Sequence, residues 1–330
     1  MIKRYNALYE KWLSDGSSEG MITIFTPTYN RANLIVRAYD CLLQQTNKNF
    51  IWLVVNDGSN DNTDEALTEL MNKNELPILY ISKANGGKHS AFETAFSEVV
   101  TEYFMCLDDD DIYYPDAVDT FLREWNSIKL EGKMNIIGAI RVLTQEANGE
   151  IVCGSKFDEK LLGAKLDQTT LESNYVKHEF YENWTCYNMS ALKTIDLFPK
   201  NYWLCVRHKF FSEAIWQGRF ARKFKCRYYF KVLREYRHDT EHSIIRSNKS
   251  YQHYLDMFIN TKMILDQDYD YAKKYLKGFV QSILIISILR AKLDISLSDL
   301  LQNTNRRSLK LLYILLSPIA YISPYPKIKK

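Results

Sequence analysis

Short apolar runs alternate with amphipathic segments along the first half of the chain. The runs are bounded by Gly, Pro, Asn or Asp, as buried strands are, and they occupy residues 22–25, 50–55, 78–81, 103–107 and 136–142. Between these runs, apolar side chains recur at helical spacing, for example at Leu34, Ala38, Cys41 and Leu42. The pattern predicts helices over residues 5–13, 34–45, 61–71, 88–99 and 115–129.

Buried strands that alternate with helices are typical of an α/β protein with a mostly parallel central sheet. In such sheets, ligands bind beyond the carboxyl ends of the strands. Polar loops at residues 26–31, 57–61 and 108–111 each follow a predicted strand. We therefore expect these loops at one edge of the sheet and a binding site where they meet.

The second half of the chain has a different pattern. Asn148 and Gly149 are typical of a hairpin turn, and residues 154–177 resemble a loop. Residues 184–198 and 203–224 combine aromatic side chains with partly helical spacing, and the chain beyond residue 250 is predicted to be all-helical. We expect an N-terminal helix and linker (1–20), the α/β domain (21–245, with halves 21–120 and 121–245) and a C-terminal helical region (246–330).

The acid run Asp108–Asp111 is the strongest chemical signal in the sequence. Four adjacent carboxylates repel one another, so their ionised forms need a nearby cation. Carboxylate oxygens suit Mg²⁺ or Mn²⁺, and such an ion can bridge two phosphates. The alternative is an acidic loop that caps the helix beginning near Pro115 and Asp116. The position of the run at the same edge as the other polar loops favours the metal site.

Three motifs together resemble those of family 2 glycosyltransferases. They are Thr26–Arg31 after the first of these strands, Val54–Thr63 after the second and Leu107–Asp111 after the fourth. The resemblance is close over residues 21–120 and weaker up to residue 245. Members of this family have the GT-A fold, use nucleotide-diphosphate sugars and usually invert the anomeric carbon. The resemblance therefore implies a GT-A fold and sugar transfer for this chain.

The same resemblance implies roles in donor binding. Pro27, Tyr29 and Arg31 would line the nucleotide pocket, and Asp57 would accept a hydrogen bond from the base, typically uracil. An imide N–H needs an acceptor, and the ring beside it needs a flat apolar wall. The alternatives are an ordinary turn for Asp57 and a core position for Tyr29.

A glycine loop precedes the helix predicted from residue 88. Asn85–Lys88 resembles the nucleotide-contacting loop of the family, in which Lys88 would reach a phosphate or the base. The loop is not a P-loop, because Ser82 and His89 stand where that motif requires Gly and Ser or Thr. A donor site of the glycosyltransferase type is therefore favoured over a P-loop nucleotide site.

Within the acid run, the resemblance assigns the metal first to Asp110 and then to Asp108. Either Asp108 or Asp109 would contact the ribose of the donor. A later loop, residues 237–243, resembles one that folds over the diphosphate in some members, and His242 there is a weaker metal candidate. The expected cofactor is Mn²⁺ or Mg²⁺.

Sugar transfer also requires a base that accepts the proton of the attacking hydroxyl. In this family the base is an acid on a helix after the acceptor loop. Residues 209–216 resemble that element, which makes Glu213 the candidate catalytic base, although the commoner Glu-Asp pair is absent. The alternative is a glutamate on a helix surface. Trp184, Tyr187 and Trp203 would shape the acceptor site or pack in the core.

Charge and cysteine usage narrow the function further. The formal net charge of +3 is too small to indicate a nucleic-acid partner. Basic residues concentrate between Arg219 and Arg237, which is typical either of a site for phosphates or anionic surfaces or of a solvated helix face. Six scattered cysteines without a CxxC pair, and a charged N-terminus without an apolar core, predict a cytoplasmic protein without a signal peptide.

The C-terminal region contains two apolar segments, Phe279–Leu289 and Leu311–Ile322, which are too short to span a bilayer. The second is flanked by the cations Arg306, Arg307, Lys310, Lys327, Lys329 and Lys330. We expect these helices either to contact the inner face of the cell membrane peripherally or to pack on the catalytic domain or an oligomer interface. The sequence leaves the oligomeric state open.

Together these features predict a metal-dependent glycosyltransferase that moves a sugar, expected from a UDP-sugar, to a hydroxyl of a polysaccharide or lipid-linked glycan. The expected mechanism is a single displacement with inversion, in the synthesis of a capsule, cell wall or other surface polysaccharide. Two alternatives stay open. One is a catalytically silent protein that binds nucleotide sugars, and the other is a membrane-docking component of a polysaccharide assembly complex.

Overall fold

The computed structural model describes the chain except residues 17, 155–156, 199–210, 238–250 and 319–330. The described residues divide into two compact units. The first unit comprises Met1–Thr169, Glu179–Ile195 and Lys223–Ser243, and the second comprises Thr170–His178, Asp196–Arg222 and Ile244–Lys330, apart from the residues outside the description. The domain limits expected at residues 20 and 245 stay a prediction.

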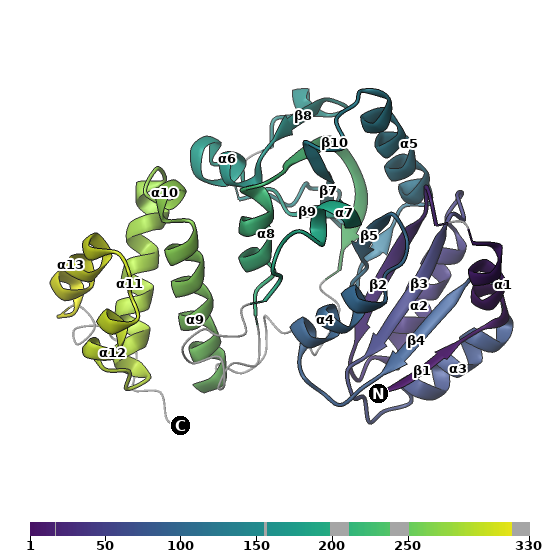
Figure 1. Ribbon diagram of the computed structural model, residues 1–330, viewed down its shortest axis with the longest axis horizontal. Helices are drawn as coiled ribbons and strands as arrows, with labels where there is room; N and C mark the ends of the chain where they lie inside the picture. Colours follow the sequence, from purple (N-terminus) through teal and green to yellow (C-terminus); the bar gives the residue numbers. More distant parts are fainter. Residues whose placement is uncertain (17, 155–156, 199–210, 238–250, 319–330) are drawn as a thin grey trace. The chain divides into compact units, whose positions relative to one another are not determined.

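The first unit is built on a ten-stranded sheet with flanking helices (Figure 1). Its elements in chain order are β1 (Ile2–Tyr5), α1 (Ala7–Asp15), β2 (Ile22–Thr28), α2 (Ala32–Leu43), β3 (Phe50–Asn56), α3 (Thr63–Lys73), β4 (Ile78–Ser82), α4 (Lys88–Glu98), β5 (Tyr103–Cys106), β6 (Ile112–Tyr113), α5 (Ala117–Leu130), β7 (Ile137–Glu146), η1 (Glu159–Leu161), β8 (Lys165–Gln168), β9 (Asn183–Asn188), α7 (Met189–Leu192) and β10 (Lys225–Tyr236).

Parallel strands form the half of the sheet that was expected from the sequence. The strand order is β1-β4-β3-β2-β5-β9-β7-β10-β6, and β8 pairs with β10. Strands β4, β3, β2 and β5 run parallel, with Ile24 opposite both Trp52 and Met105. The other half is mixed, because β9 is antiparallel to β5 and β7 whereas β7 and β10 are parallel. The prediction of a parallel α/β sheet is therefore confirmed for the region that precedes the acid run.

Both faces of the parallel half are covered by helices. Successive side chains of a strand point to opposite faces, so alternate residues enter two apolar layers. On one face, Trp52 lies in a buried cluster with Tyr39 of α2 and Trp125 of α5. On the other face, the ring of Phe25 contacts that of Phe92 on α4, with centroids 4.9 Å apart and planes inclined by 72°. Packing in these two apolar layers fixes the positions of the strand ends. The loops that follow the strands therefore begin at fixed positions.

Several strands were not predicted. β1 adds an antiparallel strand next to β4, with Ile2 opposite Ser82, where only an N-terminal helix and linker were expected. β8 lies within residues 154–177, which were expected to be a loop, and its Gln168 pairs with Cys226. Such strands are short and depend on a partner distant in sequence, so local periodicity did not reveal them.

The segment 184–198 begins with a strand, not with a helix. β9 exchanges backbone hydrogen bonds with β5 and β7, and its side chains are mostly buried. Trp184 and Tyr187 lie in the core, so the core-packing alternative is correct for these two residues. Trp203 lies outside the described residues.

The second unit is helical (Figure 1). Its elements are α6 (Thr170–Glu172), the π-helical turn η2 (Ser173–Lys177), α8 (Ala214–Ala221), α9 (Tyr251–Gln267), α10 (Tyr269–Ala272), α11 (Leu276–Lys292), α12 (Leu297–Gln302) and α13 (Arg307–Leu316). α8 packs closely on the end of α9 at Gly218, where a Cβ atom would lie 2.4 Å from the Gln267 amide. The expectation of a helical C-terminal region is confirmed. None of the described helices combines the length and apolar character required to cross a membrane.

Candidate active site

The loops that follow β2 and β3 contact each other at the carboxyl edge of the sheet. The backbone N–H of Asn30 donates to Ser59 Oγ at 2.9 Å, and the N–H of Asn60 donates to Asn30 Oδ1 at 2.8 Å. Gly58 has a positive φ of 81°, and a Cβ there would lie 2.7 Å from the backbone N of Asn85. The glycine loop after β4 therefore lies against the same edge.

Asp57 organises the glycine loop. Its buried carboxylate accepts hydrogen bonds from the N–H groups of Gly86 at 3.0 Å and Gly87 at 2.7 Å, and it pairs with Lys83 Nζ. The alternative of an ordinary turn does not account for these contacts, because they join residues about thirty positions apart. The role of Asp57 toward a nucleotide base stays a prediction.

Each carboxylate of the acid run lies next to a basic side chain. Lys88 Nζ is 2.9 Å from Asp108 Oδ1, and Arg31 Nη1 is 2.6 Å from Asp109 Oδ1 and 3.1 Å from Asp110 Oδ2. Arg234 Nη1 is 3.1 Å from Asp111 Oδ2. The repulsion expected among the four acids is thus offset by three cations, which come from the loop after β2, the first residue of α4 and β10.

Exposure alternates along the acid run. The side chains of Asp109 and Asp111 are 2% and 1% exposed, whereas those of Asp108 and Asp110 are 34% and 19% exposed. A ligand in solvent can therefore reach Asp108 and Asp110 but not their neighbours. Mg²⁺ is usually bound by one or two carboxylates together with waters and substrate phosphates, so this pair suits such an ion. Among the described residues, no three or more His, Cys, Asp or Glu side chains are grouped so that they could hold one metal ion.

Burial and charge also separate these acids by pKa. Burial raises the pKa of Asp109 to about 6 and that of Asp111 to about 7, although Arg234 opposes the shift of Asp111. Burial acts in the same direction on Asp108, but the positive charges of Lys88 and Arg234 outweigh it and lower the Asp108 pKa. Asp108 therefore stays ionised near neutral pH, as a metal or phosphate-bridging site requires.

Arg234 is a functional candidate that the sequence did not reveal. This buried residue of β10 donates from Nη1 to Asp111, from Nη2 to Glu182 Oε1 at 2.6 Å and from Nε to Thr144 Oγ1 at 2.9 Å. Its guanidinium thus joins the end of the acid run to β7 and to the start of β9. We infer that Arg234 positions the loop that holds Asp108 and Asp110.

The basic stretch between Arg219 and Arg237 was interpreted as a ligand surface or as a solvated helix face, and both interpretations are wrong for its buried members. Arg227 pairs with Glu131 and Asp167, and Arg234 pairs with Asp111. Most of the stretch is a strand, which the alternation of basic and apolar residues over 225–228 could have indicated.

Replacing Arg234 by Met should weaken metal-dependent UDP binding about tenfold, as is typical when a group that orients a ligand carboxylate is removed. It should also lower the free energy of unfolding by about 3 kcal/mol, because Asp111 loses its buried partner. Arg227→Met is the matched control, since Arg227 is a buried arginine of the same strand with two acidic partners away from the acid run. Calorimetry and chemical denaturation measure the two effects. Equal UDP affinity in both variants would limit Arg234 to a stabilising role.

The remaining predicted residues are distributed as follows. Tyr29 is 47% exposed at the end of β2, so the alternative of a core tyrosine is wrong, and Pro27 is half-buried in β2. Glu213 directly precedes α8 and is half-buried, and it belongs to the second unit. His242 and most of the loop at 237–243 lie outside the described residues.

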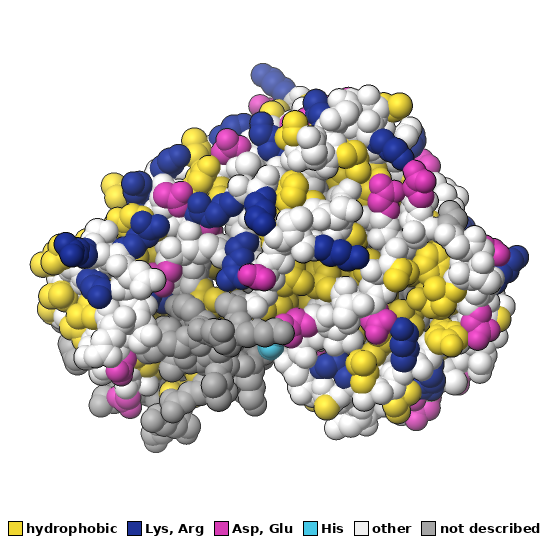
Figure 2. All heavy atoms as spheres, in the orientation of Figure 1, with side chains coloured by type: hydrophobic (Ala, Val, Ile, Leu, Met, Phe, Trp, Pro, Cys, Tyr) yellow, Lys and Arg dark blue, Asp and Glu magenta, His cyan; other side chains and the backbone are white. Residues whose placement is uncertain are grey.

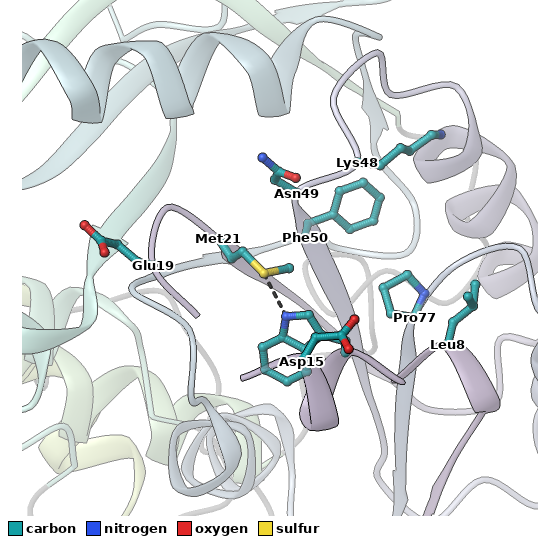
Figure 3. Close-up of a pocket in the computed structure, with 9 residues that line it drawn as sticks. Leu8, Asp15, Glu19, Met21, Lys48, Asn49, Phe50 and Pro77 are labelled. Carbon is teal, nitrogen blue, oxygen red and sulfur yellow. Dashed lines mark hydrogen bonds between the residues drawn. The ribbon is translucent and has the colours of Figure 1, made fainter. Parts of the chain in front are cut away.

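A separate hollow of about 400 Å³ lies at the opposite edge of the sheet, where β2, β3 and β4 begin (Figure 3). Trp12 donates its indole N–H toward Met21 Sδ at 2.8 Å. It is lined by Leu8, Trp12, Asp15, Glu19, Met21, Lys48, Asn49, Phe50 and Pro77. None of the predicted site residues is among them.

Known proteins share this fold. The structure of residues 1–349 of TarS from S. aureus superimposes with a TM-score of 0.53 at 14% identity, over 92% of each chain. The same protein in complex with UDP-GlcNAc gives a TM-score of 0.54 at 15% identity, over 89% of this chain and 92% of that one. The fold is therefore that of the GT-A glycosyltransferases.

Sequence comparison identifies the family. Residues 23–152 match the model of glycosyl transferase family 2. An uncharacterised glycosyltransferase of Rickettsia prowazekii is 34% identical over 147 residues, and chondroitin synthase of Pasteurella multocida is 40% identical over 105 residues. These matches cover 44% and 32% of this chain, but only 44% and 11% of the respective relatives. The match to glycosyl transferase family 2 thus includes the loops of the candidate site and spans less than half of the chain.

Proposed function

We propose that this protein transfers a sugar from a UDP-sugar to a hydroxyl of a polysaccharide or lipid-linked glycan, with inversion at the anomeric carbon. The observation that carries the proposal is the pair of solvent-open carboxylates, Asp108 and Asp110, between Arg31 and Lys88. This arrangement lies in the segment that matches the model of glycosyl transferase family 2. The TarS complex with UDP-GlcNAc supports a uridine nucleotide as donor, and chondroitin synthase among the relatives supports a glycan product.

In the donor site, each residue has a separate task. The exposed ring of Tyr29 covers one face of the base, and Pro27 contributes to the wall of the pocket. Asp57 accepts the imide N–H of uracil with the carboxylate that also orders the glycine loop. Arg31 and Lys88 neutralise the diphosphate, and Asp109 stays hydrogen-bonded to Thr28 at 3.0 Å below the ribose. Asp108 accepts a hydroxyl of the ribose or joins the metal site.

Asp110, with Asp108 as its partner, would hold Mn²⁺ or Mg²⁺. A divalent ion bound there stabilises the negative charge that grows on the leaving diphosphate. Ion pairs of the two buried acids stabilise the loop that bears Asp108 and Asp110. Asp109 and Asp111 are held by Arg31 and Arg234, so the two exposed carboxylates keep a fixed separation along the loop.

Glu213 is the proposed base. It accepts the proton of the acceptor hydroxyl while that oxygen forms a bond to the anomeric carbon and the bond from this carbon to the diphosphate breaks. Attack opposite to the leaving group inverts the anomeric carbon. The acceptor belongs to a surface polysaccharide pathway, such as capsule or cell-wall synthesis, and the protein works in the cytoplasm at the inner face of the cell membrane.

The proposal predicts that UDP and a subset of UDP-sugars raise the melting temperature of the purified protein in the presence of Mn²⁺, because they bind only the native state. GDP and ADP serve as controls. A radiolabelled form of the stabilising donor should then release UDP by hydrolysis or by transfer to a glycan acceptor. Stabilisation without turnover would instead identify a catalytically silent nucleotide-sugar sensor. Absence of any shift with uridine nucleotides would refute the donor assignment.

A further inference from the structure

Helix α13 has apolar side chains on two opposite faces. Leu309 and Tyr313 are fully buried, whereas Leu311 and Leu315 are 62% and 71% exposed and Ile314 is 46% exposed. At 3.6 residues per turn, the exposed residues lie opposite the buried pair. A helix that packs on a protein core in water needs only one apolar stripe. Packing of α13 on the described part of the chain therefore does not account for its second stripe.

The first turns of α11 extend this exposed surface. Leu276 and Val280 lie one turn apart on α11, and both are exposed. Tyr269 joins the two helices, because its ring is 5.8 Å from that of Phe279 on α11 and its hydroxyl is 2.8 Å from Ser308 Oγ on α13. We call this surface, formed by Leu276, Val280, Leu311, Ile314 and Leu315 around Tyr269, the α11–α13 face.

Cations cluster where these two helices begin. Lys273, Lys274 and Lys277 lie just before or within the first turn of α11, and Arg306, Arg307 and Lys310 lie at the start of α13. The guanidinium of Arg306 lies 4.6 Å from the centre of the Tyr269 ring. Asp270 is the single acid in the segment 269–280, and it is paired with Arg222; the segment 303–318 contains no acid. Figure 2 shows hydrophobic and basic side chains intermixed over α13 at the left of the view.

We propose that the α11–α13 face docks on an anionic lipid bilayer. Apolar side chains of such a face enter the boundary between headgroups and acyl chains, while the nearby cations meet the anionic headgroups. A second copy of this chain is a poorer partner. A two-fold interface would place the cations of one copy against the same cations of the other, and like charges repel. Docking of this face on a bilayer does not depend on sugar transfer. Only the delivery of a lipid-linked acceptor to the active site rests on the proposed function.

Vesicle co-sedimentation tests this proposal. The native protein should bind vesicles of phosphatidylcholine mixed with phosphatidylglycerol, and binding should weaken in high salt and on phosphatidylcholine alone. The double variant Leu311→Glu, Leu315→Glu should lower the partition coefficient about tenfold or more. The matched control is Leu130→Glu, which changes an exposed leucine near the end of α5 in the first unit. A second variant, Arg307→Gln with Lys310→Gln, should reduce the salt-dependent part of binding.

UDP binding by the same variants separates this proposal from the proposed function. Retained UDP affinity with lost vesicle binding would support the α11–α13 face as a lipid surface. The proposal would be overturned if the native protein did not bind anionic vesicles. It would also be overturned if the double variant bound them as well as the Leu130→Glu control. A native dimer that the double variant converts to a monomer without loss of vesicle binding would also overturn it, since the face would then be covered by a second copy. Failure of UDP binding in every form would refute the donor site and leave the lipid result intact.

Discussion

Glu213→Gln should lower the rate of sugar transfer by about 10²- to 10⁴-fold, the usual contribution of a general base. The substitution keeps the size and shape of the side chain and removes only the oxygen that accepts the proton. UDP affinity and the melting temperature should therefore stay at the native values. Single-turnover transfer from a labelled donor, with calorimetry of UDP binding on the same preparation, measures the separation between chemistry and binding.

Glu172→Gln is the matched control for this variant. Glu172 is a half-buried acid of the second unit, as Glu213 is, and it has no assigned role in catalysis. Transfer by Glu213→Gln within a few-fold of native would assign the base to another acid. Asp239 and Glu241, which lie outside the described residues, would then be tested next.

Asp110→Ala should abolish the effect of Mn²⁺ on UDP binding. In the native protein we expect Mn²⁺ to raise UDP affinity by roughly 10- to 100-fold, since an ion and a diphosphate that share a site bind with positive coupling. Asp110 is the assigned first ligand, and Arg31 can still neutralise Asp109 after the substitution. Calorimetric titration of UDP with Mn²⁺ or with a chelator compares the two conditions.

The control for this prediction is Asp119→Ala, which removes a half-buried acid in the first turn of α5, paired with Arg123 and away from the acid run. This variant should keep the native response to Mn²⁺. Equal UDP affinity of the native protein with metal and with chelator would contradict a metal-dependent donor site. A full Mn²⁺ effect in Asp110→Ala would instead assign the ion to Asp108 alone.

The sequence by itself determined the parallel half of the fold and the edge that bears the site. β2, β3, β4 and β5 were all expected from their apolar runs, because strands buried on both faces contain few polar residues and are bounded by turn residues. The helices between them were expected from spacing that reflects one buried face. Polar loops that follow parallel strands must meet at one edge of the sheet. The sequence therefore predicted that Asp57 and Asp108–Asp111 lie at the same edge.

Tertiary structure decided most of the mixed half of the sheet, in which only β7 was expected, from the apolar run at residues 136–142. β9 is enclosed between β5 and β7, and β10 pairs with β7, β8 and β6. Strand formation there depends on partners far along the chain and not on a local period. The basic residues of β10 made this strand harder to predict, because they indicated a solvated surface. Arg227 is in fact buried against Glu131 and Asp167.

The division of labour within the acid run was likewise a tertiary result. The family resemblance singled out Asp110 and Asp108, but the residue types alone show four equivalent carboxylates. Only the fold buries Asp109 and Asp111 and leaves Asp108 and Asp110 open. Arg234 reaches Asp111 from 123 positions away, a distance at which no local pattern relates two residues. Residue types thus determined that an anionic site lies at this edge, whereas burial and long-range ion pairs decided which of its oxygens a ligand can reach.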